Sequence, residues 1–332
     1  MIKKLSEAVG VSGNESNVRN IIAEFIDKLG LKRKTDSIGN LIVSSNHIDN
    51  RPTIIISAHM DEPGIIVTDI TDDGYLKFDI IGNIDMPSLV SQHIKIGETE
   101  GIISLKAVHL TTKEERQKKV KVSDLYIDIG AADKKDAETV IVPGDYGAFD
   151  TKFDIMNDYI KGKSLSSRAG CVVLLEALAK SNEYNVNIIA VFSVQKEVHG
   201  RGINVAAHSL PDADCLLLLD AEDSTPDSSF AKDKIQGIGI GRYTSGSIKT
   251  NELLSVIESI ASETDIIFHR SVVNKSNELR QIISNKNNLP IIPINIPCQF
   301  INSSINVMNK KDITDSIALI DSIIRRIEDG EL

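Results

Sequence analysis

The sequence contains few cysteines, and they form no recognisable scaffold. Its 332 residues include three, Cys171, Cys215 and Cys298, which lie far apart in apolar contexts and make no C-x-x-C pair. This spacing argues against a disulfide framework and against a cysteine-based zinc knuckle. We therefore expect three buried thiols in a reducing compartment.

The sequence also lacks the features of membrane, secreted and nucleic-acid-binding proteins. No apolar run reaches the roughly 18 residues that a membrane span requires, and the first residues, MIKKLSEAVGVSGNE, contain no apolar signal-peptide core. The net charge is -10, and an acidic chain is not expected to bind nucleic acid. We predict a cytoplasmic protein with no membrane or nucleic-acid partner.

The residues that are present are typical of a soluble globular protein. Hydrophobic residues make up 41% and charged residues 25% of the chain, and the length favours two domains. Towards both ends, strand patterns alternate with helix patterns, which predicts an α/β fold with a mainly parallel sheet sandwiched by helices. A capping box at Ser12–Glu15 is expected to begin the first helix. The predicted strands are residues 40–45, 53–59, 186–195, 214–222, 265–270 and 289–297, and the predicted helices are residues 16–30, 167–180, 201–208, 250–264, 276–286 and 311–330.

The middle of the chain has a different pattern. Between residue 65 and about residue 160, short β-prone pieces are separated by turn-rich links such as TDDG, which is typical of a small all-β module. We therefore predict an α/β domain of residues 1–64 plus 155–332, interrupted by a β-barrel-like domain of residues 65–154. The charged stretch 111–119 is expected to be a surface loop or a short helix.

Polar residues follow four of the predicted strands. Ligands in open α/β sheets bind at the carboxyl ends of strands, so these residues are site candidates. His59 and Asp61 suit a metal-bound imidazole whose other nitrogen is held by a carboxylate, although a lone histidine is often structural and Asp220 could equally cap the next helix. Together they indicate a metal or hydrolytic site. The candidates are His59, Asp61, Glu62, Lys196, Glu197, His199, Asp220, Glu222, Asp223, Gln299, Asn302 and Ser303.

The order of these motifs resembles the tetrahedral-type metallo-aminopeptidases, the family of glutamyl and deblocking aminopeptidases, some of which carry the name endoglucanase. The similarity covers nearly the whole chain and includes GVSGNE, SAHMDEPG, AVHLTTKEERQKK, DLYIDIGA, VPGDYGAFD, GKSLSSRAGCVVLLEAL, VQKEVHGRG, LDAEDSTP and IPCQFINSS. The resemblance implies a catalytic α/β domain, an inserted β domain used for dimerisation, and assembly into dodecamers. It also implies hydrolysis of N-terminal residues from peptides with two zinc or cobalt ions as cofactors.

Carried over position by position, part of the family's site is retained. The resemblance implies that His59 and Asp220 are ligands of one metal and that Glu197 is a ligand of the other. It also implies that Asp61 is the catalytic-site acid that orients His59.

Other residues occupy three further positions of the family's site. The bridging aspartate of an L-D-D-R motif falls on Ser166, with Ser167 beside it. The general-base glutamate falls on Lys196, and the second metal-binding histidine falls on Asn302.

These replacements weaken the implied metal site on chemical grounds. The Ser166 hydroxyl is a poor substitute for a bridging carboxylate, and the Asn302 amide is a weak zinc ligand. A catalytic zinc usually keeps three protein ligands, whereas one position retains His59 and Asp220 and the other retains Glu197 alone. We predict that the site holds one ion or none.

Lys196 introduces a positive charge where the family has a base. A lysine titrates near ~10.4, and the neighbouring carboxylates of Glu197 and Asp220 favour its charged form, so it cannot accept a proton at neutral pH. Uncompensated carboxylates in a pocket are costly. We therefore hypothesise that the Lys196 ammonium takes over part of the charge role of the lost metals.

Three functions remain open at this point. The first is a catalytically impaired or inactive homologue, a pseudoenzyme that binds peptides or serves as the partner subunit of an active paralogue. The second is an active metallo-aminopeptidase with an atypical mononuclear site, which His199 could complete. The third is a hydrolase that uses Ser166 or Ser167 with Lys196. The expected partners are peptides or another small-molecule substrate and further copies of the chain, as dimers or a dodecamer.

Simpler structural roles exist for the same residues. Ser166 or Ser167 could be the N-cap of the helix predicted to begin there, and Lys196 could be a solvated surface lysine.

Overall fold

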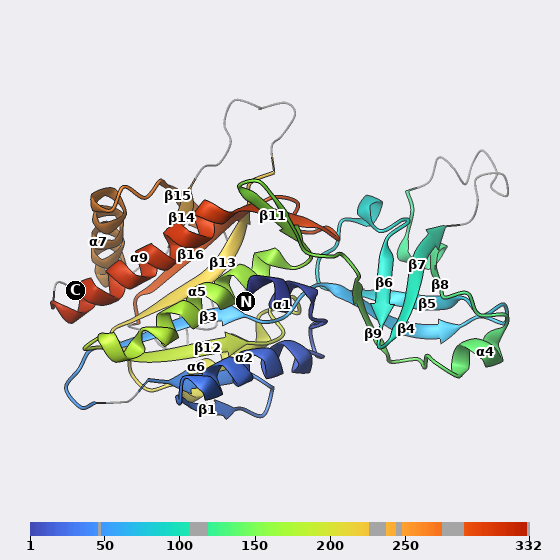
Figure 1. Cartoon of the computed structure of the whole chain (residues 1–332), viewed down its shortest axis with the longest axis horizontal. Coiled ribbons are helices and arrows are strands. Elements are labelled where there is room, and N and C mark those ends of the chain that lie inside the picture. The colour runs from blue at the N-terminus through green and yellow to red at the C-terminus, as the bar shows by residue number, and fades with distance from the viewer. Residues whose placement is uncertain (46–47, 106–118, 226–236, 244–247, 274–288, 331–332) are drawn as a thin grey trace.

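The chain folds into an α/β part and a β-barrel that lie side by side (Figure 1). The computed structural model describes residues 1–45, 48–105, 119–225, 237–243, 248–273 and 289–330. The α/β fold predicted from the sequence is confirmed. The helix predicted at 276–286 lies outside the described residues, as does nearly all of the charged stretch 111–119.

The α/β part is built on one mixed sheet. Within the described residues, eight strands form it in the order β1-β2-β12-β3-β13-β16-β14-β15. The central strands β12, β3, β13 and β16 are parallel, and β14 and β15 are parallel to each other, while the β1–β2, β2–β12 and β16–β14 pairs are antiparallel. The strands are β1 (Lys32–Thr35), β2 (Leu41–Ser44), β3 (Thr53–His59), β12 (Asn187–Ser193), β13 (Cys215–Asp223), β14 (Ile238–Tyr243), β15 (Phe268–Val273) and β16 (Ile291–Cys298).

Helices cover both faces of this sheet, because its strands carry apolar residues on both faces. Ile54 and Leu217 belong to the core that includes α1, α2, α5, α7 and α9, whereas Ile55 and Leu218 pack with α6 on the other face. A sheet buried on both faces needs nearly continuous apolar strands, which explains the sequences TIIISAH and CLLLL. The helices are α1 (Ile2–Glu7), α2 (Ser16–Lys28), α5 (Leu165–Ala179), α6 (Arg201–Ser209), α7 (Ile248–Glu263) and α9 (Lys310–Glu328).

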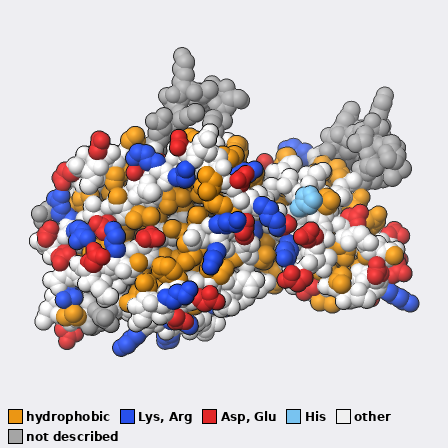
Figure 2. All heavy atoms as spheres, in the orientation of Figure 1, with side chains coloured by type: hydrophobic (Ala, Val, Ile, Leu, Met, Phe, Trp, Pro, Cys, Tyr) orange, Lys and Arg blue, Asp and Glu red, His pale blue; other side chains and the backbone are white. Residues whose placement is uncertain are grey.

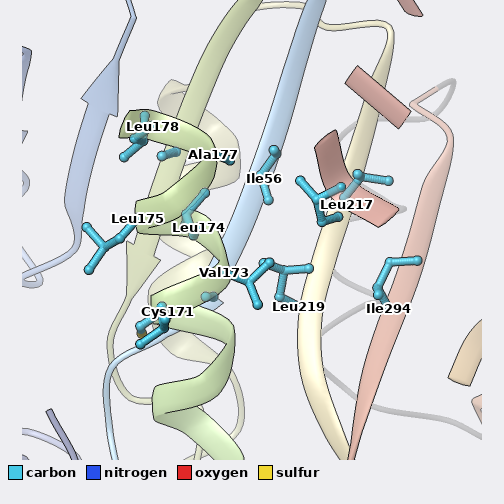
Figure 3. Packing of buried hydrophobic residues seen from close by; sticks show 14 of the residues in the cluster. Ile56, Cys171, Val173, Leu174, Leu175, Ala177, Leu178, Leu217, Leu219 and Ile294 are labelled. Carbon is cyan, nitrogen blue, oxygen red and sulfur yellow. The ribbon is translucent and has the colours of Figure 1, made fainter. Parts of the chain in front are cut away.

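Helix α5 lies at the centre of the larger core. It is apolar almost all the way round, as expected for a helix enclosed by other elements, and most of its residues are buried. Figure 3 shows Val173 and Leu174 directed toward Ile56 and Leu219 of the sheet. Because α5 begins beside the carboxyl ends of the strands, this packing fixes the position of the serines in its first turn.

The inserted segment forms a closed barrel with its own apolar core. The barrel order is β4-β5-β8-β7-β6-β9, and α4 lies beside it (Figure 1). This agrees with the all-β module predicted from the turn-rich sequence; the domain boundaries at residues 64 and 155 stay a prediction. Its elements are β4 (Gly64–Ile70), β5 (Leu76–Ile81), β6 (His93–Ile96), β7 (Thr99–Leu105), β8 (Leu125–Asp128), α4 (Lys134–Glu138) and β9 (Tyr146–Phe149).

A third, small sheet joins the segment after the barrel to the start of the last helix. Its order is β10-β11-β17, and all its pairs are antiparallel. These strands, β10 (Asp154–Met156), β11 (Tyr159–Gly162) and β17 (Asn306–Asn309), were not predicted from the sequence because each is only three or four residues long.

Two predicted caps are wrong. Ser12 does not cap α2, which begins at Ser16 with Glu15 in the N-cap position; the Ser12 hydroxyl donates instead to Asp61. Neither Ser166 nor Ser167 caps α5, because the N-cap is Ser164. The Ser12 hydroxyl makes a tertiary hydrogen bond instead of a cap. Helix α5 begins earlier than predicted, so Ser166 and Ser167 lie inside it.

The described surface carries both apolar and charged side chains, and the three cysteines lie inside. Figure 2 shows hydrophobic side chains gathered over the middle of the face that carries α5 and α9, with charged side chains around them. Cys171, Cys215 and Cys298 are free and buried, as predicted. Among the helices that the structure describes, none is long and apolar enough to cross a membrane.

Candidate functional site

The carboxyl ends of three adjacent parallel strands bring five of the predicted residues together. His59 ends β3, Asp220 lies near the end of β13, and Lys196 and Glu197 lie in the turn after β12. Since β3 is flanked by β12 and β13, these side chains and Asp61 meet at one edge of the sheet. Asp220 is therefore part of a strand in the site, and the alternative that it caps a helix is wrong.

Asp61 is a buried carboxylate that orients its neighbours. It lies 3.3 Å from His59 Nδ1, accepts a hydrogen bond from the Ser12 hydroxyl, and accepts one from the Glu197 backbone N–H at 2.9 Å. Burial alone would raise the pKa of Asp61, but His59, Ser12 and the Glu197 N–H outweigh burial and hold this pKa at about 2. Asp61 therefore fixes both the His59 ring and the turn that carries Lys196.

The Lys196 ammonium lies between two carboxylates. Its Nζ is 3.3 Å from Asp220 Oδ2, 3.4 Å from Asp220 Oδ1 and 3.6 Å from Glu197 Oε1. Burial would raise the pKa of Asp220, but the Lys196 charge and then His59 hold it well below its usual range. Lys196 is thus a paired cation of the site, and its description as a solvated surface lysine is wrong.

The second ring nitrogen of His59 faces Asp220. His59 Nε2 lies 3.6 Å from Asp220 Oδ1 and, although buried, has no hydrogen-bond partner. Burial and then Lys196 lower the pKa of His59, but the carboxylates of Asp220 and Asp61 together raise it to about 9. Without a metal, this imidazole is therefore charged at neutral pH.

The turn that carries Lys196 is strained and is held from outside. Gln195 and His199 both have positive φ, at 56° and 73°, a region that side chains other than glycine seldom occupy. Asn40 accepts from the Val194 N–H at 3.0 Å and donates to the Gly202 carbonyl at 2.8 Å. Contacts that pin both ends of a strained turn fix the placement of Lys196.

Ser166 and Asn302 meet at a separate, very small cavity. They line it together with Ile84 and other residues, and its volume is about 10 Å³, which is room for one water molecule. The barrel closes this region, because the Asp85 N–H donates to the Asn302 carbonyl at 2.8 Å. A Cβ added to Gly82 would meet the Glu197 side chain at 3.0 Å.

A buried ion cluster lies beside the site, and sequence reasoning missed most of it. Lys163 Nζ is 2.7 Å from both oxygens of Glu62, and Arg168 Nη2 is 3.3 Å from Glu62 Oε1. The Ser164 hydroxyl also donates to Glu62. Burial would raise the pKa of Glu62, but the Lys163 and Arg168 charges lower it. Only the position of Glu62 after a buried strand could have signalled this cluster.

The remaining candidates lie apart from the Lys196 pair. His199 is exposed. Glu222 pairs with His269 of β15 at 2.6 Å, and a side chain on Gly239 would collide with that carboxylate. Asp223 accepts from the Thr225 N–H at 2.9 Å. Gln299 and Ser303 line two different cavities.

The donors present do not fit a pair of metal ions. Across the described residues, no three His, Cys, Asp or Glu side chains are grouped closely enough to hold a metal ion. His59 and Asp220 supply two donors and the latter is already paired with Lys196. The buried Nε2 of His59 is the one feature here that suits a metal ligand.

The fold and the strand-end residues define a peptidase-like α/β protein with an inserted barrel, and comparison with known proteins identifies its family. Residues 39–319 match the model of the M42 glutamyl aminopeptidase family. The chain belongs to this family, whose members depend on metal ions.

Individual relatives match over nearly their full length. A protein of Acetivibrio thermocellus that bears an aminopeptidase name is 29% identical over 323 residues, covering 96% of each chain. The crystal structure of a TET aminopeptidase from a marine-sediment Thaumarchaeota archaeon is 27% identical, covers 100% of this chain and 98% of that one, and has a TM-score of 0.91. The Pyrococcus horikoshii TET1 peptidase is 26% identical with a TM-score of 0.82, covers 97% of this chain and 98% of its own, and can assemble into a tetrahedron or a large octahedral shell.

Proposed function

We propose that this family member does not assemble the two-metal centre and is a catalytically impaired or inactive homologue of the aminopeptidases. The observation that supports this most directly is the Lys196 ammonium, 3.3 Å from Asp220 and 3.6 Å from Glu197. A divalent ion bound by these carboxylates would lie beside a fixed positive charge, and like charges at such distances repel strongly. The Lys196 side chain must therefore move away from these carboxylates before two ions can bind.

The positions of Ser166 and Asn302 support the same proposal. Both side chains are neutral, and the cavity they share has a volume of about 10 Å³. A hydroxyl and an amide are weak ligands for zinc or cobalt. The space that Ser166 and Asn302 share has room for about one water molecule, so this shared space is not large enough for a hydrated divalent ion.

Hydrolysis of aminoacyl-p-nitroanilides tests the proposal. The purified chain, incubated with zinc or cobalt, is expected to release nitroaniline at the rate of a metal-free blank for acidic, basic and apolar substrates. Turnover at typical enzyme rates, roughly 1 s⁻¹ or faster, that is abolished by a chelator would contradict it.

A gain-of-function variant makes the test two-sided. Restoring the family residues together, with Ser166→Asp, Lys196→Glu and Asn302→His, is expected to create metal binding and chelator-sensitive hydrolysis. The matched control carries the same three exchanges at exposed positions, Ser255→Asp, Lys152→Glu and Asn182→His, and is expected to gain neither. A restored variant that folds but binds no more metal than the control would refute the residue assignments.

A second candidate function is an active aminopeptidase with one metal ion. The buried, unpartnered Nε2 of His59 favours it, since this atom faces Asp220. It predicts one tightly bound ion per chain and slow turnover that His59→Gln abolishes. A serine–lysine mechanism is a weaker candidate, because the Ser167 hydroxyl donates to the Ser164 carbonyl at 3.0 Å; labelling of Ser166 or Ser167 by a fluorophosphonate probe would be needed to support it.

We also propose a localisation, an oligomeric state and binding partners for the protein. We expect a cytoplasmic homo-oligomer whose barrel contributes to dimerisation, as dimers or a dodecamer, since the similar Pyrococcus horikoshii protein forms shells. Within it, the chain would bind peptides or serve as the partner subunit of an active paralogue.

A further inference from the structure

A second, larger cavity lies close to the segment that carries Asn302. Its volume is about 320 Å³, which is in the range of small-molecule sites. Its lining includes Tyr159 of β11 and the side chains of Lys311, Asp312 and Asp315 at the beginning of α9. Gln299 lines this cavity, and Asn302, three residues later, lines the small cavity beside Ser166. The metallo-aminopeptidase resemblance assigns no role to it.

The small sheet supplies the floor of this cavity. Tyr159 of β11 and Asn309 of β17 are cross-strand partners, and Val307 pairs with Gln299 in an isolated bridge. Residues two apart on a strand point to the same face, so Val307 and Asn309 share that face with the Tyr159 ring. The floor therefore combines an aromatic ring and a methyl surface with two amide side chains.

The charged side chains that line the cavity belong to helix α9. Lys311 Nζ lies 2.6 and 2.8 Å from the two oxygens of Asp315, so this ammonium is held by Asp315. Asp312 is the second carboxylate of the lining, and in the part of the chain that the structure describes no cation or hydrogen-bond donor reaches its carboxylate oxygens within bonding distance. Burial, and then the charge of Asp315, raises the pKa of Asp312 to about 6, and the nearby charge of Lys311 offsets only part of this rise.

We propose that this cavity binds a primary ammonium or guanidinium group on an aliphatic stem, with the cation paired to Asp312 and lying against the Tyr159 ring. The cation of the ligand would donate a charge-assisted hydrogen bond to the Asp312 carboxylate. The face of Tyr159 attracts cations, and Val307, Pro297 and Ile267 provide the apolar wall for the stem. Asn309 and Gln299 can accept the remaining N–H groups through their amide oxygens.

Two sources of this chemistry exist, a free small amine and the side chain of a lysine in a peptide. The probes are therefore butylamine and the blocked tripeptide acetyl-Gly-Lys-Gly-amide, each beside a neutral counterpart, butanol and the norleucine tripeptide. Saturation-transfer NMR titrations on the full chain measure the affinities. Butylamine, the lysine tripeptide or both are expected to bind, and the neutral counterparts are expected to bind at least tenfold more weakly.

Variants show whether binding depends on this cavity. Asp312→Asn is expected to weaken the cationic probe about tenfold or more, the effect of losing one charge-assisted hydrogen bond. Asp329→Asn makes the same change of charge just after the end of α9 and is expected to have no effect. If Asp312→Asn does not fold, Tyr159→Leu retains the carboxylate and is expected to weaken binding about threefold.

The outcomes separate cleanly. Binding of butylamine, with or without the peptide, assigns the cavity to small amines, and binding of the peptide alone assigns it to a lysine side chain. No binding by either probe, equal binding of the neutral counterparts, or full affinity in Asp312→Asn would overturn the proposal. None of these results depends on whether the chain hydrolyses peptides.

Discussion

At the scale of single residues, the account depends on one exchange, the appearance of a lysine ammonium among carboxylates. Lys196 is 27% exposed, and its partners Asp220 and Glu197 are 25% and 14% exposed. At this degree of burial a charge pair is worth more than a surface salt bridge, and the removal of one partner leaves the others uncompensated.

Lys196→Met is the first prediction, because methionine keeps much of the side-chain volume but removes the charge. We expect it to lower the free energy of unfolding by about 1–3 kcal/mol. Added zinc or cobalt should raise the melting temperature of Lys196→Met more than that of the unmodified chain. Lys152→Met, which removes a 73% exposed lysine from Asp150, is the control and should change stability by less than about 1 kcal/mol. Equal stability of both variants would show that Lys196 compensates nothing.

Asp61 gives a prediction about pH. Its pKa is lowered to about 2 in the folded chain from an ordinary value of 3.8, so the unfolded state binds the proton first. The stability that Asp61 contributes is therefore present above about pH 4 and is lost as the pH falls through about 2, and the difference amounts to about 2 kcal/mol. Urea unfolding at a series of pH values should show this loss in the unmodified chain and a shallower loss in Asp61→Asn. Parallel pH profiles for the two proteins would contradict the assignment.

At the scale of helices and strands, much of the fold followed from apolar periodicity. The largely buried strands β3, β12, β13 and β16 were predicted because their residues are mostly apolar. The short strands of the small sheet were not, because three or four residues carry little periodic signal. The strand-end rule placed His59, Lys196 and Asp220 together, since parallel strands end at one edge.

Long-range hydrogen bonds explain most of what sequence patterns missed. Ser12 looked like a helix cap, but its hydroxyl donates to Asp61, 49 residues later. Lys163 and Arg168 bind the buried Glu62 across more than 100 residues, and nothing local in the sequence specifies either contact. A pattern that spans four residues cannot report on such pairs.

A substitution at Asn40 tests what holds the turn that carries Lys196. Its side chain joins the Val194 N–H to the Gly202 carbonyl and also donates to Asp36 at 2.7 Å. Asn40→Ala would leave buried backbone groups without partners, so we expect a loss of about 2–4 kcal/mol. Asn182→Ala, at an exposed position, should be neutral within about 0.5 kcal/mol. Thermal unfolding measures the stability of both variants. An unchanged free energy of unfolding in Asn40→Ala would show that the turn does not depend on the Asn40 side chain.

At the scale of the whole molecule, the chain has the architecture of the family, and we propose that only the chemistry of its site differs. The barrel and the α/β part match solved relatives over the entire chain, with a TM-score of 0.91. Because the fold is shared over its whole length, we propose that the surfaces that join copies in the relatives are retained in this chain.

Assembly is therefore expected to survive the loss of the metal centre. Mass photometry of the purified chain should give a particle whose mass is a multiple of the 36.3 kDa subunit, and a chelator should not dissociate it. A particle of one subunit at micromolar concentration would contradict the proposed oligomer. Dissociation by the chelator would instead show that metal ions hold the assembly.

Metal content measured by inductively coupled plasma mass spectrometry shows how many ions the site of the unmodified chain holds. The purified chain is saturated with zinc or cobalt and then dialysed to remove loosely bound ions. The account predicts at most one retained ion per chain, and a higher content in the variant with Ser166→Asp, Lys196→Glu and Asn302→His. Two tightly retained ions per unmodified chain would contradict it.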